Sequence, residues 1–99
     1  MDIKTLSQFK PQLSRLAHKY GISRMYVFGS VARGDSNSSS DVDLILEMQP
    51  GASLFGAAGF SHEAEKLLNL KVDIVPYGII HKLTDHQFVE NVQREAVEL

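Results

Sequence analysis

Apolar residues at intervals of three and four mark the first part of the chain. They are Leu6, Phe9, Leu13, Leu16 and Tyr20, and this spacing places them on one face of a helix. Pro11 interrupts the run, because a proline removes one backbone donor and clashes with the preceding turn. We therefore expect a short helical turn up to about Phe9, then a main helix that begins near Pro11 and stops at Gly21.

Three short segments, rich in β-branched and aromatic residues, are predicted to be strands. They are residues 24–28 (RMYVF), 42–47 (VDLILE) and 71–75 (KVDIV), the last closed by Pro76. Residues 30–40 fit one turn of helix followed by a connector, whose polar run at 35–40 (DSNSSS) is typical of an exposed loop. Residues 49–51 (QPG) predict the next turn.

Two further helices are expected. Residues 54–69 carry Leu54, Phe55, Ala58, Ala64, Leu67 and Leu68 behind a Ser53 N-cap, although Gly56 and Gly59 each weaken the helix by about 1 kcal/mol. Residues 84–87 (TDHQ) have the form of a capping box, followed by apolar residues at helical spacing. The order helix, strand, strand, helix, strand, helix predicts an α/β or α+β domain. Its three- or four-stranded mixed sheet would be covered by helices.

Composition narrows the class of protein only modestly. The chain has 99 residues, which predicts a single domain over residues 1–99. A formal charge of −2 disfavours a protein that grips nucleic acid by bulk electrostatics. The absence of cysteine excludes a disulfide scaffold and a thiol nucleophile. Nothing resembles a signal peptide or a membrane span of about 18 apolar residues, so we expect a cytoplasmic protein.

Candidate chemistry begins at Gly29 and Ser30, directly after the first predicted strand. A glycine lets the backbone approach a ligand closely. Backbone donors and a serine hydroxyl at the start of a helix form a site suited to phosphate. Taken alone, such a pair is more often simply a turn.

Aspartates in two of the predicted strands give a stronger indication. Asp41 and Asp43 project from one face of a strand, because residues two apart share a face. Asp73 lies between Val72 and Ile74 and would join them if the third strand lies beside the second. Three carboxylates repel one another without a cation, whereas Mg²⁺ would make them a site for phosphoryl chemistry. The alternative is a solvent-facing acidic strand.

Together these residues resemble a known family. The order is Gly29-Ser30, ten residues, Asp41-Val42-Asp43 and a later Asp73. It is similar to that of the minimal nucleotidyltransferase branch of the DNA polymerase β-like superfamily. Residues 28–35 (FGSVARGD) and 40–44 (SDVDL) match longer strings typical of that branch. The resemblance extends over most of the chain and implies the polymerase β-like nucleotidyltransferase fold.

The resemblance implies roles for the three aspartates. Asp41 and Asp43 would bind one or two Mg²⁺ ions together with the nucleotide. Asp73 would complete the second metal site and help to activate the acceptor hydroxyl.

It also implies how the triphosphate is held. Gly29 and Ser30 would contact the β- and γ-phosphates, and Arg33 would neutralise the triphosphate or the departing pyrophosphate. The alternative for Arg33 is a solvated loop residue or a partner of Asp35.

Relatives of this size are typically encoded beside a HEPN-domain RNase toxin and act as its antitoxin, and some transfer AMP from ATP to a tyrosine of that toxin. The resemblance therefore implies a Mg²⁺-dependent protein adenylyltransferase. We expect the acceptor side to be built by a partner, because 99 residues leave little for a second domain. Two alternatives stay open: an antitoxin that masks its toxin sterically, and transfer to a small molecule or RNA. The preferred nucleotide and any homo-oligomer also stay open.

A few other residues are interpreted as structural. We expect Tyr26 in the core, Glu47 exposed at a strand end, and the four histidines at surface or cap positions. Phe55 and Phe60 could line a surface for a base or a partner, but we interpret both as core residues.

Overall fold

The computed structural model describes residues 2–34, 41–80 and 86–99. Its elements follow the chain as α1 (Ile3–Gln8), α2 (Lys10–Lys19), β1 (Ile22–Phe28), α3 (Gly29–Arg33), β2 (Val42–Met48), α4 (Leu54–Leu68), β3 (Val72–Pro76), α5 (Tyr77–Ile80), α6 (His86–Glu95) and β4 (Val97–Glu98). The predicted break between two N-terminal helices is confirmed, with Pro11 in the first turn of α2, where its missing N–H has no intrahelical partner to lose.

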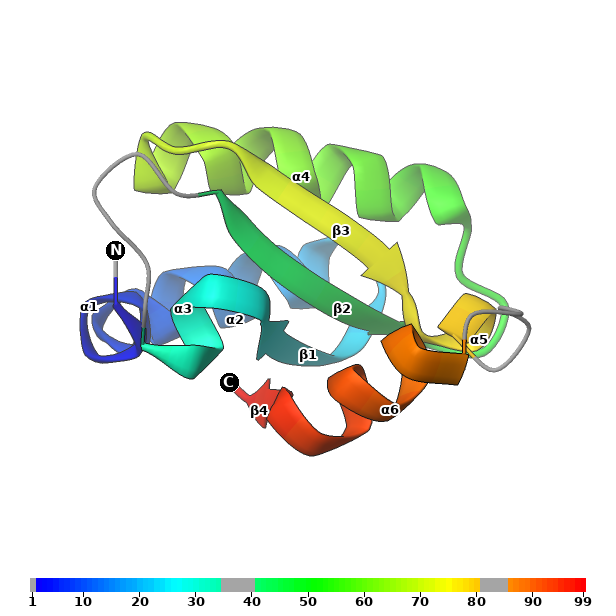
Figure 1. The fold of residues 1–99 in the computed structure, drawn as a ribbon. Coiled ribbons are helices and arrows are strands. Elements are labelled where there is room, and N and C mark those ends of the chain that lie inside the picture. The colour runs from blue at the N-terminus through cyan, green and yellow to red at the C-terminus, as the bar shows by residue number, and fades with distance from the viewer. Residues whose placement is uncertain (1, 35–40, 81–85) are drawn as a thin grey trace.

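The four strands form one mixed sheet in the order β3-β2-β1-β4. β1 runs antiparallel to β2 and β4, whereas β2 and β3 are parallel neighbours. A parallel pair needs a long crossover, and α4 provides it (Figure 1). The predicted α/β class and mixed sheet are confirmed.

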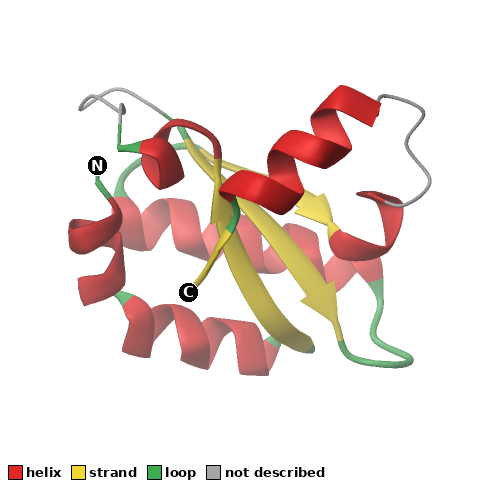
Figure 2. Cartoon of the chain, turned by 60° about the horizontal axis from the view of Figure 1, so that its bottom comes forward, coloured by secondary structure: helices red, strands yellow, loops and turns green. Residues whose placement is uncertain are grey.

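Helices cover both faces of the sheet. Figures 1 and 2 show α2 and α4 on one side of the strands and α6 on the other. The main core lies on the α2–α4 side and includes Val42, Leu44 and Phe60, each 0% exposed. A smaller core of Ile45, Ile80 and Val92 lies on the opposite face. The prediction that Val42 and Leu44 point into a core is confirmed.

Helix α4 corrects the predicted apolar face. Leu54 and Phe55 are 59% and 88% exposed, because they occupy its first turn, outside the core. The buried positions are instead Ala57, Phe60, Ala64 and Leu68, spaced by three and four residues as a buried helix face requires. Ser53 caps the helix as expected, accepting a hydrogen bond from the Phe55 N–H at 3.1 Å.

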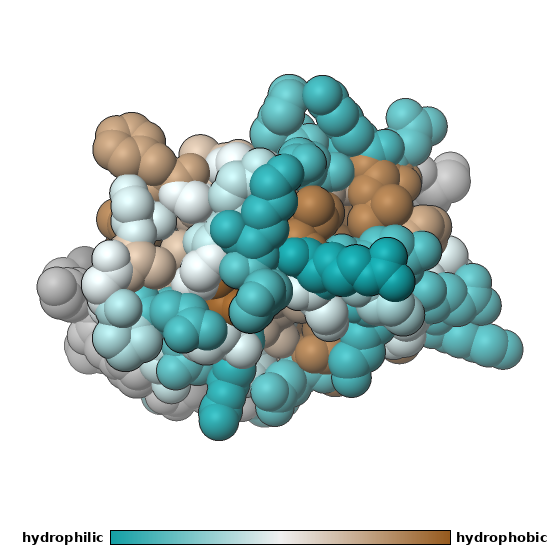
Figure 3. Space-filling view, turned by 180° about the vertical axis from the view of Figure 1, so that it is seen from behind, coloured by the Kyte–Doolittle hydropathy of each residue, from teal (hydrophilic) through white to brown (hydrophobic). Residues whose placement is uncertain are grey.

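The two glycines of α4 are explained by its contact with α2. A Cβ on Gly56 would lie 2.5 Å from the Tyr20 carbonyl oxygen, and one on Gly59 would lie 2.5 Å from Tyr20 Cε1. Glycine therefore lets the two helices approach closely enough to bury the main core between them and the sheet. Figure 3 shows the outer side of this layer, where hydrophilic side chains cover most of the face and apolar patches are small.

The remaining points concern the short elements, the start of α6 and the length of the helices. β4 and α5 were not predicted, since two and four residues are too few to show a period. Thr84 of the expected capping box lies outside the described residues, although α6 follows it as predicted. No helix within the described ranges is long and apolar enough to cross a membrane.

Candidate active site

Asp43 and Asp73 are brought together by the register of the two parallel strands. Asp43 of β2 pairs directly with Asp73 of β3, and neighbouring strands lie about 4.8 Å apart. Both residues are half-buried, on the face opposite the buried Val42 and Val72. The condition on which the role of Asp73 depended, that the third predicted strand lies beside the second, is therefore met.

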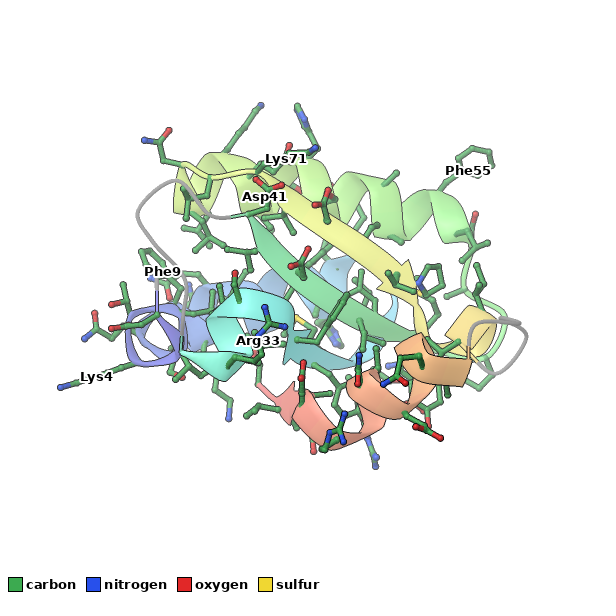
Figure 4. The ribbon with its side chains drawn as sticks, viewed as in Figure 1. Lys4, Phe9, Arg33, Asp41, Phe55 and Lys71 are labelled. Atoms are coloured by element: carbon green, nitrogen blue, oxygen red, sulfur yellow. The ribbon has the colours of Figure 1, made fainter. Side chains whose placement is uncertain are left out.

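Asp41 lies at the same end of the sheet, directly before β2. The Val42 N–H donates to the Lys71 carbonyl at 2.9 Å, so the chain at Asp41 runs beside the residue that precedes β3. Figure 4 shows Asp41 and Lys71 together at this end. Among the residues that the structure describes, no three His, Asp or Glu side chains are arranged to hold a metal ion. The structure therefore pairs Asp43 with Asp73, with Asp41 nearby but not converged on them.

The electrostatics of this end of the sheet favour a bound cation. Burial raises the pKa of the Asp43 carboxyl, and the negative charges of Asp73 and Asp41 raise it further. Arg33 acts in the opposite direction on the same pKa. A carboxylate that is hard to ionise gains most from an added positive charge. Carboxylate oxygens are also the ligands that Mg²⁺ prefers, so the donor set fits that metal chemically.

Gly29 brings the backbone of the Gly-Ser turn against the Asp43 carboxylate. Phe28, the last residue of β1, pairs with Asp43, and α3 begins at Gly29. A Cβ at Gly29 would lie 2.5 Å from Asp43 Oδ2, and its φ of +74° favours glycine. The predicted Gly-Ser turn therefore lies beside the aspartates, as binding of a phosphate next to a carboxylate-held metal would require.

Arg33 ends α3 and contacts the C-terminal helix. Its Nη1 lies 3.3 Å from Glu95 Oε2 of α6, a pairing that nothing in the sequence pattern predicted. Figure 4 shows Arg33 on α3, and its charge reaches the Asp43 carboxylate. The structure therefore has a positive charge near Asp43, and the role of Arg33 at the triphosphate stays a prediction. The alternative partner Asp35 lies outside the described residues.

Lys71 is a charged neighbour of the site that was not predicted from the sequence. Its Nζ lies 3.8 Å from Asp73 Oδ1, and the two side chains are 67% and 46% exposed. The Lys71-Val72-Asp73 spacing carried the signal, because residues two apart in a strand share a face.

For the residues interpreted as structural, the structure agrees with some of the predicted positions and contradicts others. Phe60 is buried as expected, whereas the core interpretation of Phe55 is wrong. Tyr26 packs against the smaller core, and its ring stacks on Tyr77 with centroids 6.0 Å apart. Glu47 is half-buried rather than exposed. Of the histidines, His18 and His62 are exposed as expected, and the side chains of the other two lie outside the described part.

Comparison with known proteins identifies the family. Residues 6–99 match the nucleotidyltransferase domain family, so the chain belongs to it and is a nucleotidyltransferase. A relative from Methanocaldococcus jannaschii, named "Putative protein adenylyltransferase MJ0435", is 30% identical over 94 residues. The match covers 95% of this chain and 97% of that relative.

Solved structures agree with this assignment. One described as a "putative minimal nucleotidyltransferase" matches with a TM-score of 0.78 and 36% identity, covering 100% of this chain and 97% of the other. A toxin–antitoxin complex with AMP-PNP contains a chain that matches with a TM-score of 0.68. At 15% identity over 90% of this chain and 70% of that one, it shows the shared fold alone. The minimal nucleotidyltransferase fold expected from the sequence is thereby confirmed.

Proposed function

We propose that this nucleotidyltransferase transfers AMP from ATP to a tyrosine hydroxyl of a partner protein, a HEPN-domain toxin, and so acts as its antitoxin. The observation that carries the proposal is the pairing of Asp43 with Asp73 across β2 and β3, with Gly29 set against the Asp43 carboxylate. This arrangement supports a site in which a turn suited to phosphate lies beside an acidic pair.

Two comparisons support the finer parts of the proposal. The relative from Methanocaldococcus jannaschii carries the name of a protein adenylyltransferase, which favours AMP as the transferred group and a protein as the acceptor. The complex with AMP-PNP is a toxin–antitoxin pair, which favours ATP as donor and a toxin as partner. The HEPN identity and the tyrosine rest on the family resemblance of the sequence.

The reaction follows from the side chains at the site. The acceptor oxygen forms a bond to the α-phosphorus of ATP, the bond from that phosphorus to pyrophosphate breaks, and the hydroxyl proton leaves toward Asp73. Asp41, Asp43 and Asp73 would hold one or two Mg²⁺ ions, which supply charge neutralisation at the phosphates. Gly29 and Ser30 would hold the distal phosphates, and Arg33 would balance the charge of the departing pyrophosphate.

The experiment mixes the protein with ATP, Mg²⁺ and the toxin encoded beside it, and follows both chains by intact mass spectrometry. We expect AMP additions on the toxin with the wild type and none with the Asp41→Asn, Asp43→Asn double variant. Lys66→Gln is the matched control, because this exposed residue of α4 belongs to the layer that covers the opposite face of the sheet.

The same variants separate catalysis from masking. If the double variant neutralises the toxin as well as the wild type does, the protein acts by steric binding and the transferase proposal fails for toxin control. Labelling that persists in the double variant contradicts the assignment of the aspartates. Circular dichroism of each variant confirms that loss of labelling is not loss of fold.

A further inference from the structure

We propose that the Lys71 ammonium is the resting counter-cation of Asp73 and that a divalent metal ion displaces it when the site is loaded. The inference rests on the proposed function, since it takes the aspartates as metal ligands. It adds a positioning residue that competes with the metal, at a place where the sequence pattern suggested only a strand end.

The geometry gives Lys71 a fixed backbone and a movable side chain. Its carbonyl accepts from the Val42 N–H at 2.9 Å, and the next N–H, of Val72, donates to Glu65 Oε2 at 2.9 Å. Anchored on both sides, the residue holds its Nζ 3.8 Å from Asp73 Oδ1, with 67% of the side chain exposed. Lys71 can therefore leave Asp73 by side-chain rotation alone, without a change in the sheet.

The negative charges around the site favour a positively charged residue at position 71. Asp43, Asp73 and Asp41 concentrate negative charge, and the pKa of Asp43 is raised in part by its two acidic neighbours. Arg33 offsets this charge from the α3 side, where it also pairs with Glu95. Lys71 places a positive charge 3.8 Å from Asp73 Oδ1, on the β3 side. The two cations flank the acidic pair, one beside the phosphate-binding turn and the other at the outer strand.

The contact between Lys71 and Asp73 must break when a metal reaches Asp73. An Asp73 oxygen that ligated a divalent ion would gain a stronger electrostatic partner than the exposed Lys71 ammonium, because exposed ion pairs contribute little. The lysine therefore weakens metal binding modestly, and we expect its removal to tighten binding about two- to fivefold, the factor that corresponds to a surface ion pair.

The test measures Mn²⁺ binding by the metal-free protein, using the electron paramagnetic resonance signal of free Mn²⁺. We expect Lys71→Gln to lower the Mn²⁺ dissociation constant about two- to fivefold, and Lys71→Arg, which keeps the charge, to restore the wild-type value. Lys66→Gln removes the same charge from the groove between α2 and α4, near Arg15 and Glu63, and should leave Mn²⁺ binding unchanged.

A double-mutant cycle with Asp73→Asn tests whether the effect passes through Asp73. In that background, Lys71→Gln should no longer tighten the remaining Mn²⁺ binding. Equal tightening with and without Asp73 would mean a general field effect and would overturn the inference, as would unchanged or weaker binding by Lys71→Gln alone. Absence of saturable Mn²⁺ binding by the wild type would contradict the metal role in the proposed function as well, so the two failures are distinguishable.

Discussion

At the scale of single residues, Gly29 is constrained twice. Its φ of +74° disfavours any side chain, and a Cβ would lie 2.5 Å from Asp43 Oδ2. The first constraint is one of backbone energy and the second is one of space beside a site carboxylate. Gly51 allows the two constraints to be tested separately, because it has a similar φ of +82° but open space where its Cβ would point.

We expect Gly29→Ala to lower nucleotidyl transfer at least tenfold, since the carboxylate must move and a displacement of about 1 Å at a reacting centre can cost about a hundredfold. Gly51→Ala should carry a similar backbone penalty of about 1–2 kcal/mol and keep its activity. Thermal melts and initial rates measure both. Equal activity losses in the two variants would show that the close contact at Asp43 has no role in the reaction.

Asp43 is a second residue at which the proposed role in metal binding conflicts with stability of the fold. Its pKa is raised above the ordinary value of 3.8 by burial and by its acidic neighbours, so the folded chain holds its proton more tightly than the unfolded chain does. Stability is therefore lost as pH rises through these pKa values. We expect Asp43→Asn to melt at a higher temperature than the wild type at pH 7 in EDTA.

The pH dependence of this difference in melting temperature tests whether ionisation of Asp43 causes it. Below the pKa of the unfolded chain both states hold the proton, so the difference between Asp43→Asn and the wild type should fade as pH is lowered toward 3. Glu98→Gln, at an exposed carboxylate of β4, should show no comparable gain. If Asp43→Asn melts lower than the wild type at pH 7, the ionised Asp43 carboxylate stabilises the fold and the expected conflict does not exist.

At the scale of elements, the contact between α2 and α4 shows why helix propensity is a poor guide to this part of the chain. Gly59 costs the helix about 1 kcal/mol relative to alanine, yet a Cβ there would meet the Tyr20 ring at 2.5 Å. The ring cannot easily move aside, because its hydroxyl donates to Glu63 of the same helix. Packing between the helices therefore opposes the gain that alanine would give.

We expect Gly59→Ala to destabilise the protein by about 1–3 kcal/mol, the usual cost of overpacking. Gly78→Ala is the matched change, since Gly78 lies in α5 with open space around it, and it should be neutral or stabilise by up to about 1 kcal/mol. Urea unfolding of both variants gives the two free energies. A stabilised Gly59→Ala would mean that Tyr20 repacks freely.

At the outer edge of β3, side chains of α4 satisfy the backbone of Val72. Ser61 Oγ donates to the Val72 carbonyl at 3.1 Å, and Glu65 Oε2 accepts from the Val72 N–H at 2.9 Å. Pro76 ends the same strand and has no N–H to offer. These features restrict pairing of another strand at this edge, so a partner is expected to approach the aspartates over the face of the sheet.

Several helices and strands, and the strand positions of the aspartates, could be predicted because each has a local signal in the sequence. The signal is periodicity, a helix cap, or the alternation of side chains along a strand. The pairing of Asp43 with Asp73 could not be fixed, since a crossover helix such as α4 allows more than one register. Leu54 and Phe55 were placed wrongly, because an apolar residue in the first turn of a helix looks the same in sequence whether or not a core reaches it. The Arg33–Glu95 contact joins residues far apart in the chain and has no local signal.

At the scale of the whole molecule, buried apolar side chains hold the helices against the two faces of the sheet. Among the side chains that the structure describes, Phe60 is the largest that is fully buried, whereas Phe55, five positions earlier in the same helix, is 88% exposed. A domain of this size is stable by only about 5–15 kcal/mol. The loss of one large core residue is therefore a substantial fraction of the total.

We expect Phe60→Ala to cost about 3–5 kcal/mol and Phe55→Ala to change stability by less than about 0.5 kcal/mol. Chemical denaturation of the two variants measures the difference directly. Similar costs at both positions would mean that Phe55 is covered in solution, by a second copy of the chain or otherwise.

The register between β2 and β3 also decides which pairing of the two strands gives a stable fold. A slip of one residue would turn Asp73 toward the main core and Val72 toward solvent, because side chains alternate along a strand. A chain paired in that way would bury a carboxylate among apolar side chains and would not persist. The register that pairs Asp43 with Asp73 is therefore also the register that keeps Val72 in the main core. A stably folded molecule thus already holds the two carboxylates of the candidate site side by side.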